Sequence, residues 1–121
     1  MSRFYRQKRV GNWVRTMFGD DVAMSMPERG MRLAEEALEA AQAAGVDEAT
    51  ALRLVMRVYN RPAGTLQKEV GQVGVTLLAL AEAAGLDADE AEFFEVIRIS
   101  TIPKETFAAR HAAKVEQGVA V

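Results

Sequence analysis

Apolar residues recur along the chain at intervals of three and four residues, which is the spacing of one face of an α-helix. No segment alternates apolar and polar residues over the two-residue period of a β-strand. Proline is scarce, alanine and leucine are abundant, and glycine stands mostly between the periodic segments. This pattern predicts an all-α protein in which short turns join the helices.

Periodicity and the residues that begin or end helices together predict six helices. The segment Ser25–Glu28 has the form of a capping box, in which a serine and a glutamate three residues later satisfy free N–H groups of the first turn. Asp47, Thr65 and Asp87 are the expected N-caps of three later helices. Glycine directly follows the first, second and fourth helices. The predicted helices span about residues 4–18, 25–44, 47–60, 66–84, 87–99 and 103–114.

Size and composition predict one domain that spans residues 1–121. A chain of this length buries about 65% of the surface that it exposes when unfolded. It contains no cysteine, which excludes disulfides and thiolate metal sites. No apolar run reaches the roughly 18–20 residues of a membrane helix, and the basic start MSRFYRQKRVGNW precedes no apolar block typical of a signal peptide. We therefore expect a cytoplasmic protein with no membrane partner.

Charge is spread unevenly along the chain, although its net value is only -2. Residues 1–20 form a basic first helix, in which five cations precede the first acid, Asp20. Two interpretations remain open. The first helix is either an ordinary solvated helix, or a basic zone kept apart from the acids so that an anion and a metal can bind together. The five cations are Arg3, Arg6, Lys8, Arg9 and Arg15.

Acidic residues of the second predicted helix lie directly beside its apolar stripe. At 100° per residue, Glu28, Glu35 and Glu39 form one row, and Glu36 lies further round the helix. Like charges at this spacing repel by about 0.2–0.5 kcal/mol per pair, so a helix built only for solubility would alternate the signs. The row is therefore either a solvated face rich in a good helix former or part of a metal site. The apolar stripe consists of Met31, Ala34, Leu38 and Ala41.

The fourth predicted helix carries an acid within its apolar face. On the helical wheel Glu69 falls inside that face and Gln72 falls at its edge. Burial of an unpartnered carboxylate is costly, whereas a divalent cation with hard oxygen ligands, such as Mg²⁺, removes that cost. Glu69 also lies near the start of the helix, where the helix dipole alone would favour it. The expected buried face consists of Leu66, Val70, Val73, Leu77 and Leu80.

Two sequence elements resemble those of the all-α nucleoside triphosphate pyrophosphohydrolases, the MazG-like superfamily. The segment Glu35–Glu39, EEALE, resembles the EExxE element of that family. The segment Glu69–Val73, EVGQV, resembles its ExxD element, which an apolar run also follows here. The resemblance covers residues 25–115 and implies a bundle of five to six helices, assembled as an intertwined homodimer or tetramer.

The resemblance also implies a reaction and roles for individual residues. Family members bind Mg²⁺ through these acids, with Mn²⁺ as an alternative, and hydrolyse a nucleoside triphosphate to the monophosphate and pyrophosphate. Glu36, Glu39 and Glu69 would be metal ligands together with Gln72, and Glu35 would be a further ligand or the base that orients the water. Together Glu35 and Glu36 are the expected catalytic residues. The expected substrate-binding residues are Arg61, Lys104, Arg110 and Lys114.

One position departs from the family pattern, because Gln72 stands where the family has an aspartate. An amide oxygen can ligate a cation but brings no charge, so metal affinity should fall. The alternative to an enzyme is therefore a weak or inactive member that regulates by binding nucleotides or a protein. A nucleic-acid-binding module that uses the basic first helix fits poorly with a pI near 5.5.

Overall fold

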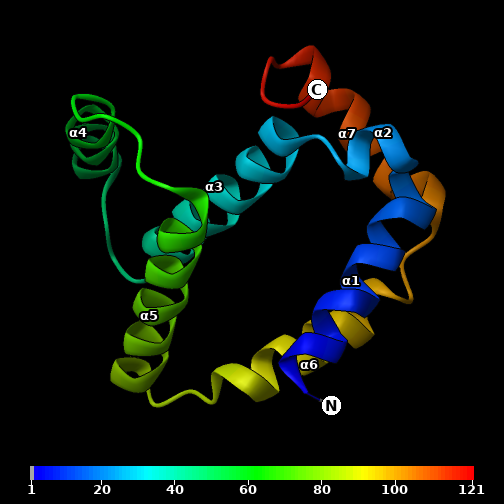
Figure 1. The fold of residues 1–121 in the computed structure, drawn as a ribbon, viewed down its shortest axis with the longest axis horizontal. Coiled ribbons are helices and arrows are strands. Elements are labelled where there is room, and N and C mark those ends of the chain that lie inside the picture. The colour runs from blue at the N-terminus through cyan, green and yellow to red at the C-terminus, as the bar shows by residue number, and fades with distance from the viewer. Residues whose placement is uncertain (1) are drawn as a thin grey trace. The chain divides into compact units, whose positions relative to one another are not determined.

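Seven helices form the part of the chain that the structure, a computed structural model, describes, residues 2–121 (Figure 1). The all-α class predicted from the periodicity is confirmed, and six of the helices correspond to predicted ones. The additional helix, α2, is a single turn, too short to produce a periodic pattern. The helices are α1 (Arg3–Phe18), α2 (Asp20–Ala23), α3 (Met26–Ala43), α4 (Glu48–Tyr59), α5 (Leu66–Ala84), α6 (Ala88–Ile99) and α7 (Lys104–Glu116).

Local side-chain hydrogen bonds begin two helices as predicted. The Asp47 carboxylate accepts a hydrogen bond from the Thr50 backbone N–H at 2.8 Å. Interaction with the Thr50 side chain, followed by this backbone hydrogen bond, lowers the pKa of Asp47 below its ordinary value. Asp87 accepts from the Glu90 N–H at 3.0 Å in the same way. Thr65 differs, because α5 begins directly after it but its side chain makes no capping hydrogen bond.

Glycines end three of the helices at the predicted positions. A glycine with a positive φ angle stands directly after α1 and α5 and two residues after the end of α3. Glycine adopts this conformation without the steric cost of a side chain. The predicted ends of these helices are therefore confirmed. The three φ angles are 82° at Gly19, 98° at Gly45 and 68° at Gly85.

The chain divides into two compact units, and the division falls within α3. One unit runs up to Leu33 and resumes over Asp87–Val121, so it holds α1, α2, α6, α7 and the start of α3. The other unit, Ala34–Leu86, holds the rest of α3 together with α4 and α5.

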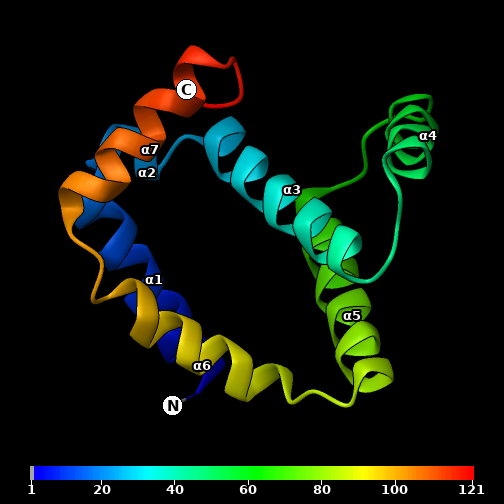
Figure 2. The same ribbon diagram turned by 180° about the vertical axis from the view of Figure 1, so that it is seen from behind.

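Helix α1 is the centre of the first unit and contacts α2, α6 and α7. Figures 1 and 2 show α6 beside the first half of α1 and α7 beside its second half. Val14 of α1, Ala23 of α2 and Val96 of α6 are buried at these contacts. Val14 stands at helical spacing from Val10 and Met17, so it belongs to the apolar side of α1.

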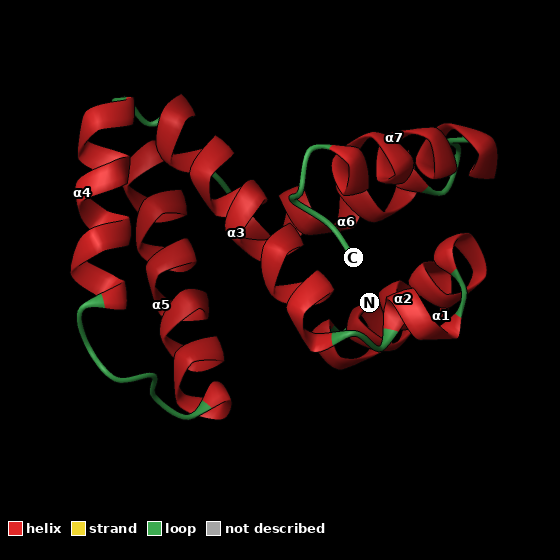
Figure 3. Ribbon diagram, turned by 90° about the horizontal axis from the view of Figure 1, so that it is seen from above, coloured by secondary structure: helices red, strands yellow, loops and turns green. Residues whose placement is uncertain are grey.

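The second unit exposes the apolar faces that the sequence pattern assigns to a core. In α5 the expected buried face is uncovered, from Leu66, 67% exposed, to Leu77, 39% exposed, and only Ala81 is buried. In α3 the expected core residue Leu38 is 49% exposed, and α4 has no buried residue. No pair of helices in this unit makes more than marginal contact, and Figure 3 shows α4 and α5 as two separate helices that a loop connects. The prediction that these faces are buried is therefore wrong for the single chain, because no neighbouring element covers them.

Within residues 2–121, no single helix combines the length and the apolar composition that crossing a membrane requires.

Candidate functional site

The unit Ala34–Leu86 contains every residue that the sequence analysis assigned to the metal. Glu35, Glu36 and Glu39 lie on α3, within the part that belongs to this unit. Glu69 lies in the first turn of α5, and Gln72 lies in the next turn. Helix α4 connects the two acidic elements, so the order of elements is acidic helix, connecting helix, acidic helix.

These side chains are accessible from solvent. Glu36, Glu39, Glu69 and Gln72 are exposed, and Glu35 is partly buried. The expectation that Glu69 is buried within an apolar face is therefore wrong for the single chain, since α3 and α4 leave that face of α5 open. Cations can therefore reach these side chains directly from solvent.

The candidate ligands suit Mg²⁺ by their chemistry. Within residues 2–121 of the single chain, however, no three Asp, Glu, His or Cys side chains lie close enough together to hold a metal ion. Carboxylate and amide oxygens are the hard ligands that Mg²⁺ prefers. Among the described residues of the single chain, the α3 acids and the α5 acid therefore do not form a metal site together. The metal assignment stays a prediction.

The Glu69 carboxylate is turned toward the segment that precedes α5. A side-chain carbon placed on Gly64 would lie 3.3 Å from Glu69 Cδ. Glycine at this position therefore leaves room for the Glu69 carboxylate beside the start of the helix. Arg61, the one predicted phosphate-binding residue in this unit, is exposed in the same preceding segment.

Glu28, which the helical wheel placed in the acidic row, belongs to a different site. Its side chain is 1% exposed, and its carboxylate pairs with Arg29 at 3.2 Å and with Arg32 Nε at 3.1 Å. The same carboxylate accepts a hydrogen bond from the Val121 backbone N–H at 3.1 Å. Arg32 in turn donates to the Val119 carbonyl. Glu28 therefore ties the start of α3 to the C-terminal segment.

Only half of the predicted capping box forms at this site. The Glu28 backbone N–H donates to Ser25 Oγ at 3.3 Å, as expected. The Glu28 carboxylate does not return to Ser25, because the two arginines and the Val121 N–H engage it instead.

The other predicted phosphate-binding residues lie together on α7, in the first unit. Lys104 is the first residue of this helix and is exposed. The Arg110 guanidinium lies over the Phe107 ring, 5.8 Å from its centroid. Lys114, partly buried, stands one turn beyond Arg110. Phosphate is favoured by the cations and by the free N–H groups that start the helix.

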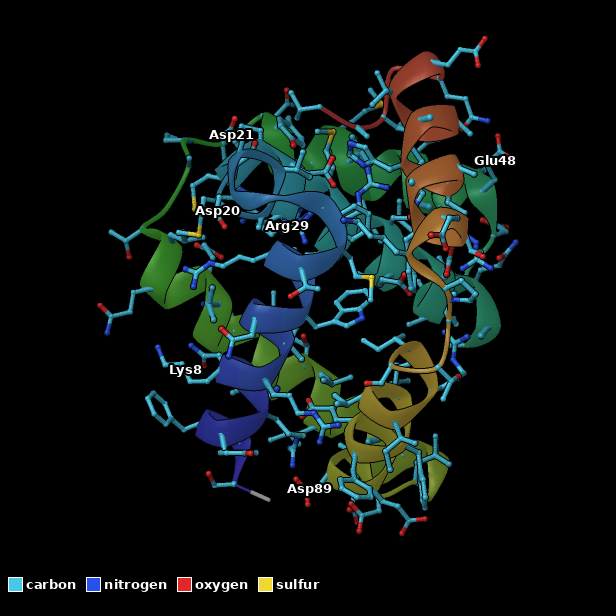
Figure 4. All side chains as sticks on the ribbon, turned by 90° about the vertical axis from the view of Figure 1, so that its right-hand side faces the viewer. Lys8, Asp20, Asp21, Arg29, Glu48 and Asp89 are labelled. Atoms are coloured by element: carbon cyan, nitrogen blue, oxygen red, sulfur yellow. The ribbon has the colours of Figure 1, made fainter. Side chains whose placement is uncertain are left out.

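The basic first helix is not simply solvated, because α6 engages its first turns. Arg6 is only 4% exposed and pairs with Asp89 at 2.6 Å and with Glu92 at 2.8 Å. The hydrogen bond to Glu92, followed by the one to Asp89, raises the pKa of Arg6 above its ordinary value. Arg3 also pairs with Glu92 at 3.0 Å. Figure 4 shows Lys8 on the side of α1 turned away from α6.

Trp13 packs in an aromatic cluster between α1 and α7. Its ring meets Phe107 edge-on at 5.0 Å and Phe18 at 6.1 Å, and His111 lies 5.6 Å from Phe18. These contacts give Trp13 and His111 packing roles. The buried Trp13 Nε1 has no hydrogen-bond partner within the part of the chain that the structure describes.

Helical periodicity did not reveal two features of the structure. One is the pairing of Arg6 with acids of α6, and the other is the set of contacts that Glu28 makes with two arginines and Val121. Both join residues more than 80 positions apart, so no local pattern could reveal them. The one available signal was the unusual basic run of the first helix followed by acids in the fifth predicted helix.

Comparison with known proteins adds no evidence on the family or the function of this protein. The chain matches no protein-family model, no curated protein and no solved structure. The resemblance to the pyrophosphohydrolases therefore rests on the two acidic elements, their order and the all-α fold.

Proposed function

We propose that the protein is a Mg²⁺-dependent nucleoside triphosphate pyrophosphohydrolase that produces a nucleoside monophosphate and pyrophosphate. One observation carries the proposal. A single compact unit, Ala34–Leu86, holds both acidic elements on two long helices with one connecting helix, and its ligand candidates are all oxygen donors. The substrate is an intracellular metabolite, so we place the protein in the cytoplasm.

The residues divide into three roles. Glu36, Glu39 and Glu69 hold the metal through carboxylate oxygens, and Gln72 contributes its amide oxygen. A bound divalent cation supplies Lewis acidity and lowers the pKa of its water. Glu35 accepts the proton of the attacking water, while the bond between the α- and β-phosphates breaks and pyrophosphate leaves. Arg61 binds phosphate oxygens. The cations of α7 in the other unit are further candidates for binding phosphate: Lys104, Arg110 and Lys114.

The proposed enzyme acts as a homo-oligomer. The second unit exposes apolar side chains on α3, α4 and α5 that a soluble chain would normally cover. Association of two copies covers such faces and holds the α3 and α5 acids in fixed positions. The exposed apolar residues of α4 are Leu52, Leu54, Val55, Met56, Val58 and Tyr59.

Pyrophosphate release tests the proposal directly. The purified chain is incubated with a panel of ribo- and deoxyribonucleoside triphosphates and millimolar Mg²⁺ or Mn²⁺. We expect monophosphate and pyrophosphate in equal amounts, and no release when EDTA is present. The melting temperature should also rise with either metal, because a ligand that binds only the folded state stabilises it. No product, together with an unchanged melting temperature, would contradict both the reaction and the metal site.

A regulatory protein that binds nucleotide without cleaving it is the second candidate. Gln72 favours it, because the uncharged amide weakens the metal site relative to an aspartate. In an enzyme, Gln72→Asp should tighten Mg²⁺ binding and bring activity to lower metal concentration, since charge outweighs the shorter reach for a hard cation. The measurement is activity against Mg²⁺ concentration. Tight nucleotide binding with no product, in both the wild type and the variant, would support the regulator.

A further inference from the structure

The cations of α1 fall into two groups that differ in their partners. On the side that meets α6, Arg3 and Arg6 are held in ion pairs by acids of that helix. Lys8, Arg9 and Arg15 are exposed elsewhere on α1, and Figure 4 shows Lys8 turned away from α6. None of these three cations takes part in the ion pairs of residues 2–121. They are therefore available to an anion from outside the chain.

Two neighbouring rows of residues make up this outer face of α1. Within each row the residues follow one another at steps of four, three and four, so they lie along one side of the helix. Both rows begin with an aromatic residue and continue one turn later with a cation, and all eight residues are exposed. The outer face contains no acid. The rows are Phe4, Lys8, Gly11 and Arg15, and Tyr5, Arg9, Asn12 and Thr16.

The two aromatic side chains of the outer face stand open to solvent. Phe4 is 68% exposed and Tyr5 is 60% exposed. Neither takes part in the ring-to-ring contacts of residues 2–121. The Lys8 ammonium lies 5.1 Å from the centroid of the Phe4 ring, so a cation and an open ring stand side by side. This combination suits a ligand that offers both phosphates and flat bases.

A glycine leaves the helix backbone bare at the middle of the outer face. Glycine inside a helix is less stable than alanine, so its presence there calls for a reason. Gly11 does not have the positive φ angle that favours glycine. A side-chain carbon at Gly11 would meet nothing within 4 Å. Neither backbone geometry nor packing in the single chain accounts for this glycine, whereas close approach of a ligand to the backbone does.

We propose that the outer face of α1 binds single-stranded nucleic acid. Its three cations bind phosphate oxygens, the rings of Phe4 and Tyr5 stack on bases, and the amide of Asn12 donates hydrogen bonds to the sugar-phosphate backbone. The ligand passes over Gly11, where no side chain stands in its way. This inference goes beyond the proposed reaction and does not depend on it.

The pI near 5.5 of the whole chain does not describe the charge of this face. The other unit, Ala34–Leu86, carries seven acids and only four cations, an excess larger than the net charge of -2 of the whole chain. The negative charge therefore lies in the unit without α1. Phosphate binding depends on the charges close to the ligand, because salt screens charges beyond about 8–10 Å.

Polar residues of the outer face favour nucleic acid over a lipid surface. A helix that lies in a membrane interface needs a continuous apolar side. Phe4 and Tyr5 are the only apolar side chains of the outer face, and both belong to its first turn. Its remaining turns carry Asn12, Thr16 and cations, which are groups that contact phosphates and sugars.

Binding of a labelled oligothymidylate of about twelve nucleotides, a length typical of single-strand sites, tests the proposal on the full chain. Fluorescence anisotropy over a salt series measures the affinity. Three phosphate contacts should give a slope of log K against log salt of about -2. Lys8→Glu/Arg9→Glu should weaken binding about tenfold or more and reduce the slope by about 1.4. Arg53→Glu/Arg57→Glu on α4 makes the same change of charge at exposed cations of the other unit, and it should leave binding unchanged.

Two further variants separate stacking and close approach from charge. Phe4→Ala/Tyr5→Ala should weaken binding about tenfold or more but keep the salt slope, because lost stacking releases no counterions. Gly11→Leu should raise the melting temperature, since leucine is the better helix former, and yet weaken binding, because its side chain occupies the place of the ligand. A loss of binding with a raised melting temperature cannot come from unfolding.

Each outcome supports or overturns the proposal. Equal losses for the α1 and α4 charge variants would show attraction to any cation of the chain and overturn the assignment to α1. A duplex bound more tightly than the single strand would overturn the stacking role of the rings. Binding to phosphatidylserine vesicles but not to the oligonucleotide would assign the face to an anionic membrane instead. Pyrophosphate release tests the reaction separately, and Lys8→Glu/Arg9→Glu should keep it, so a wild type that binds the oligonucleotide but releases no pyrophosphate would overturn the reaction alone.

Discussion

Replacement of Glu69 by glutamine is expected to reduce pyrophosphate release at least about a hundredfold, the usual order for loss of a group that acts on the transition state. Glu69 is the only acid that the second element supplies, because its partner position is Gln72. Glutamine keeps the size and helix propensity of the side chain but removes its charge. Glu36→Gln should have an effect of the same order. The measurement is kcat/KM for the preferred triphosphate at saturating Mg²⁺.

Glu48→Gln is the matched control for these variants. Glu48 is exposed in the same unit, at the start of α4, and belongs to neither acidic element. This variant should keep wild-type activity. Mg²⁺ titration by calorimetry adds a second readout, in which Glu69→Gln and Glu36→Gln should lose affinity. If all three variants were as active as the wild type, the acidic rows would be solvated helix faces only.

Replacement of Glu28 by glutamine is expected to lower the free energy of unfolding by about 1–3 kcal/mol, because a buried amide replaces the carboxylate that two partly buried arginines pair with. Glu28 is the largest fully buried side chain of residues 2–121, and two arginines and the Val121 N–H converge on it. Urea denaturation followed by circular dichroism measures the change. The variant should also release the C-terminal segment, which faster hydrogen exchange of the Val121 amide would report.

An exposed glutamate in the same unit provides the comparison. Glu105→Gln on α7 removes the same charge at an exposed position, so its effect should stay within about 0.5 kcal/mol. A loss for Glu28→Gln no larger than that of Glu105→Gln would show that the cluster contributes no net stability. Arg32→Met provides a further check, since it removes both an ion pair of Glu28 and the donor to the Val119 carbonyl.

Helix positions followed from the sequence because the signals that set them are local. Asp47 caps α4 through a residue three positions away, and Gly85 ends α5 because glycine readily takes the left-handed conformation found there. α2 escaped prediction because four residues give no periodicity. The candidate ligands were equally local, since Glu35, Glu36 and Glu39 fall on one helix and Glu69 with Gln72 on another.

Burial and pairing could not be predicted in this way, because they depend on residues distant in sequence. The wheel placed Glu28 with the other acids of α3, yet its carboxylate is buried and accepts a hydrogen bond from Val121, 93 positions away. Arg6 looked like one more solvated cation, yet Asp89 and Glu92 bury it against α6. In each case the burial of the side chain depends on which segment lies opposite it, and helical periodicity does not give that information.

The amino-acid sequence by itself determined the helices, their caps and the two acidic elements, since hydrogen bonds and side-chain spacing within a few residues decide all three. Only the tertiary structure decided which charged groups are buried and which apolar faces stay open. The reason is that the burial of a side chain depends on the residues around it in space, which are often distant in the sequence. The same periodic pattern that marks a core face in α5 leaves that face exposed in the single chain, where no second layer of helices covers it.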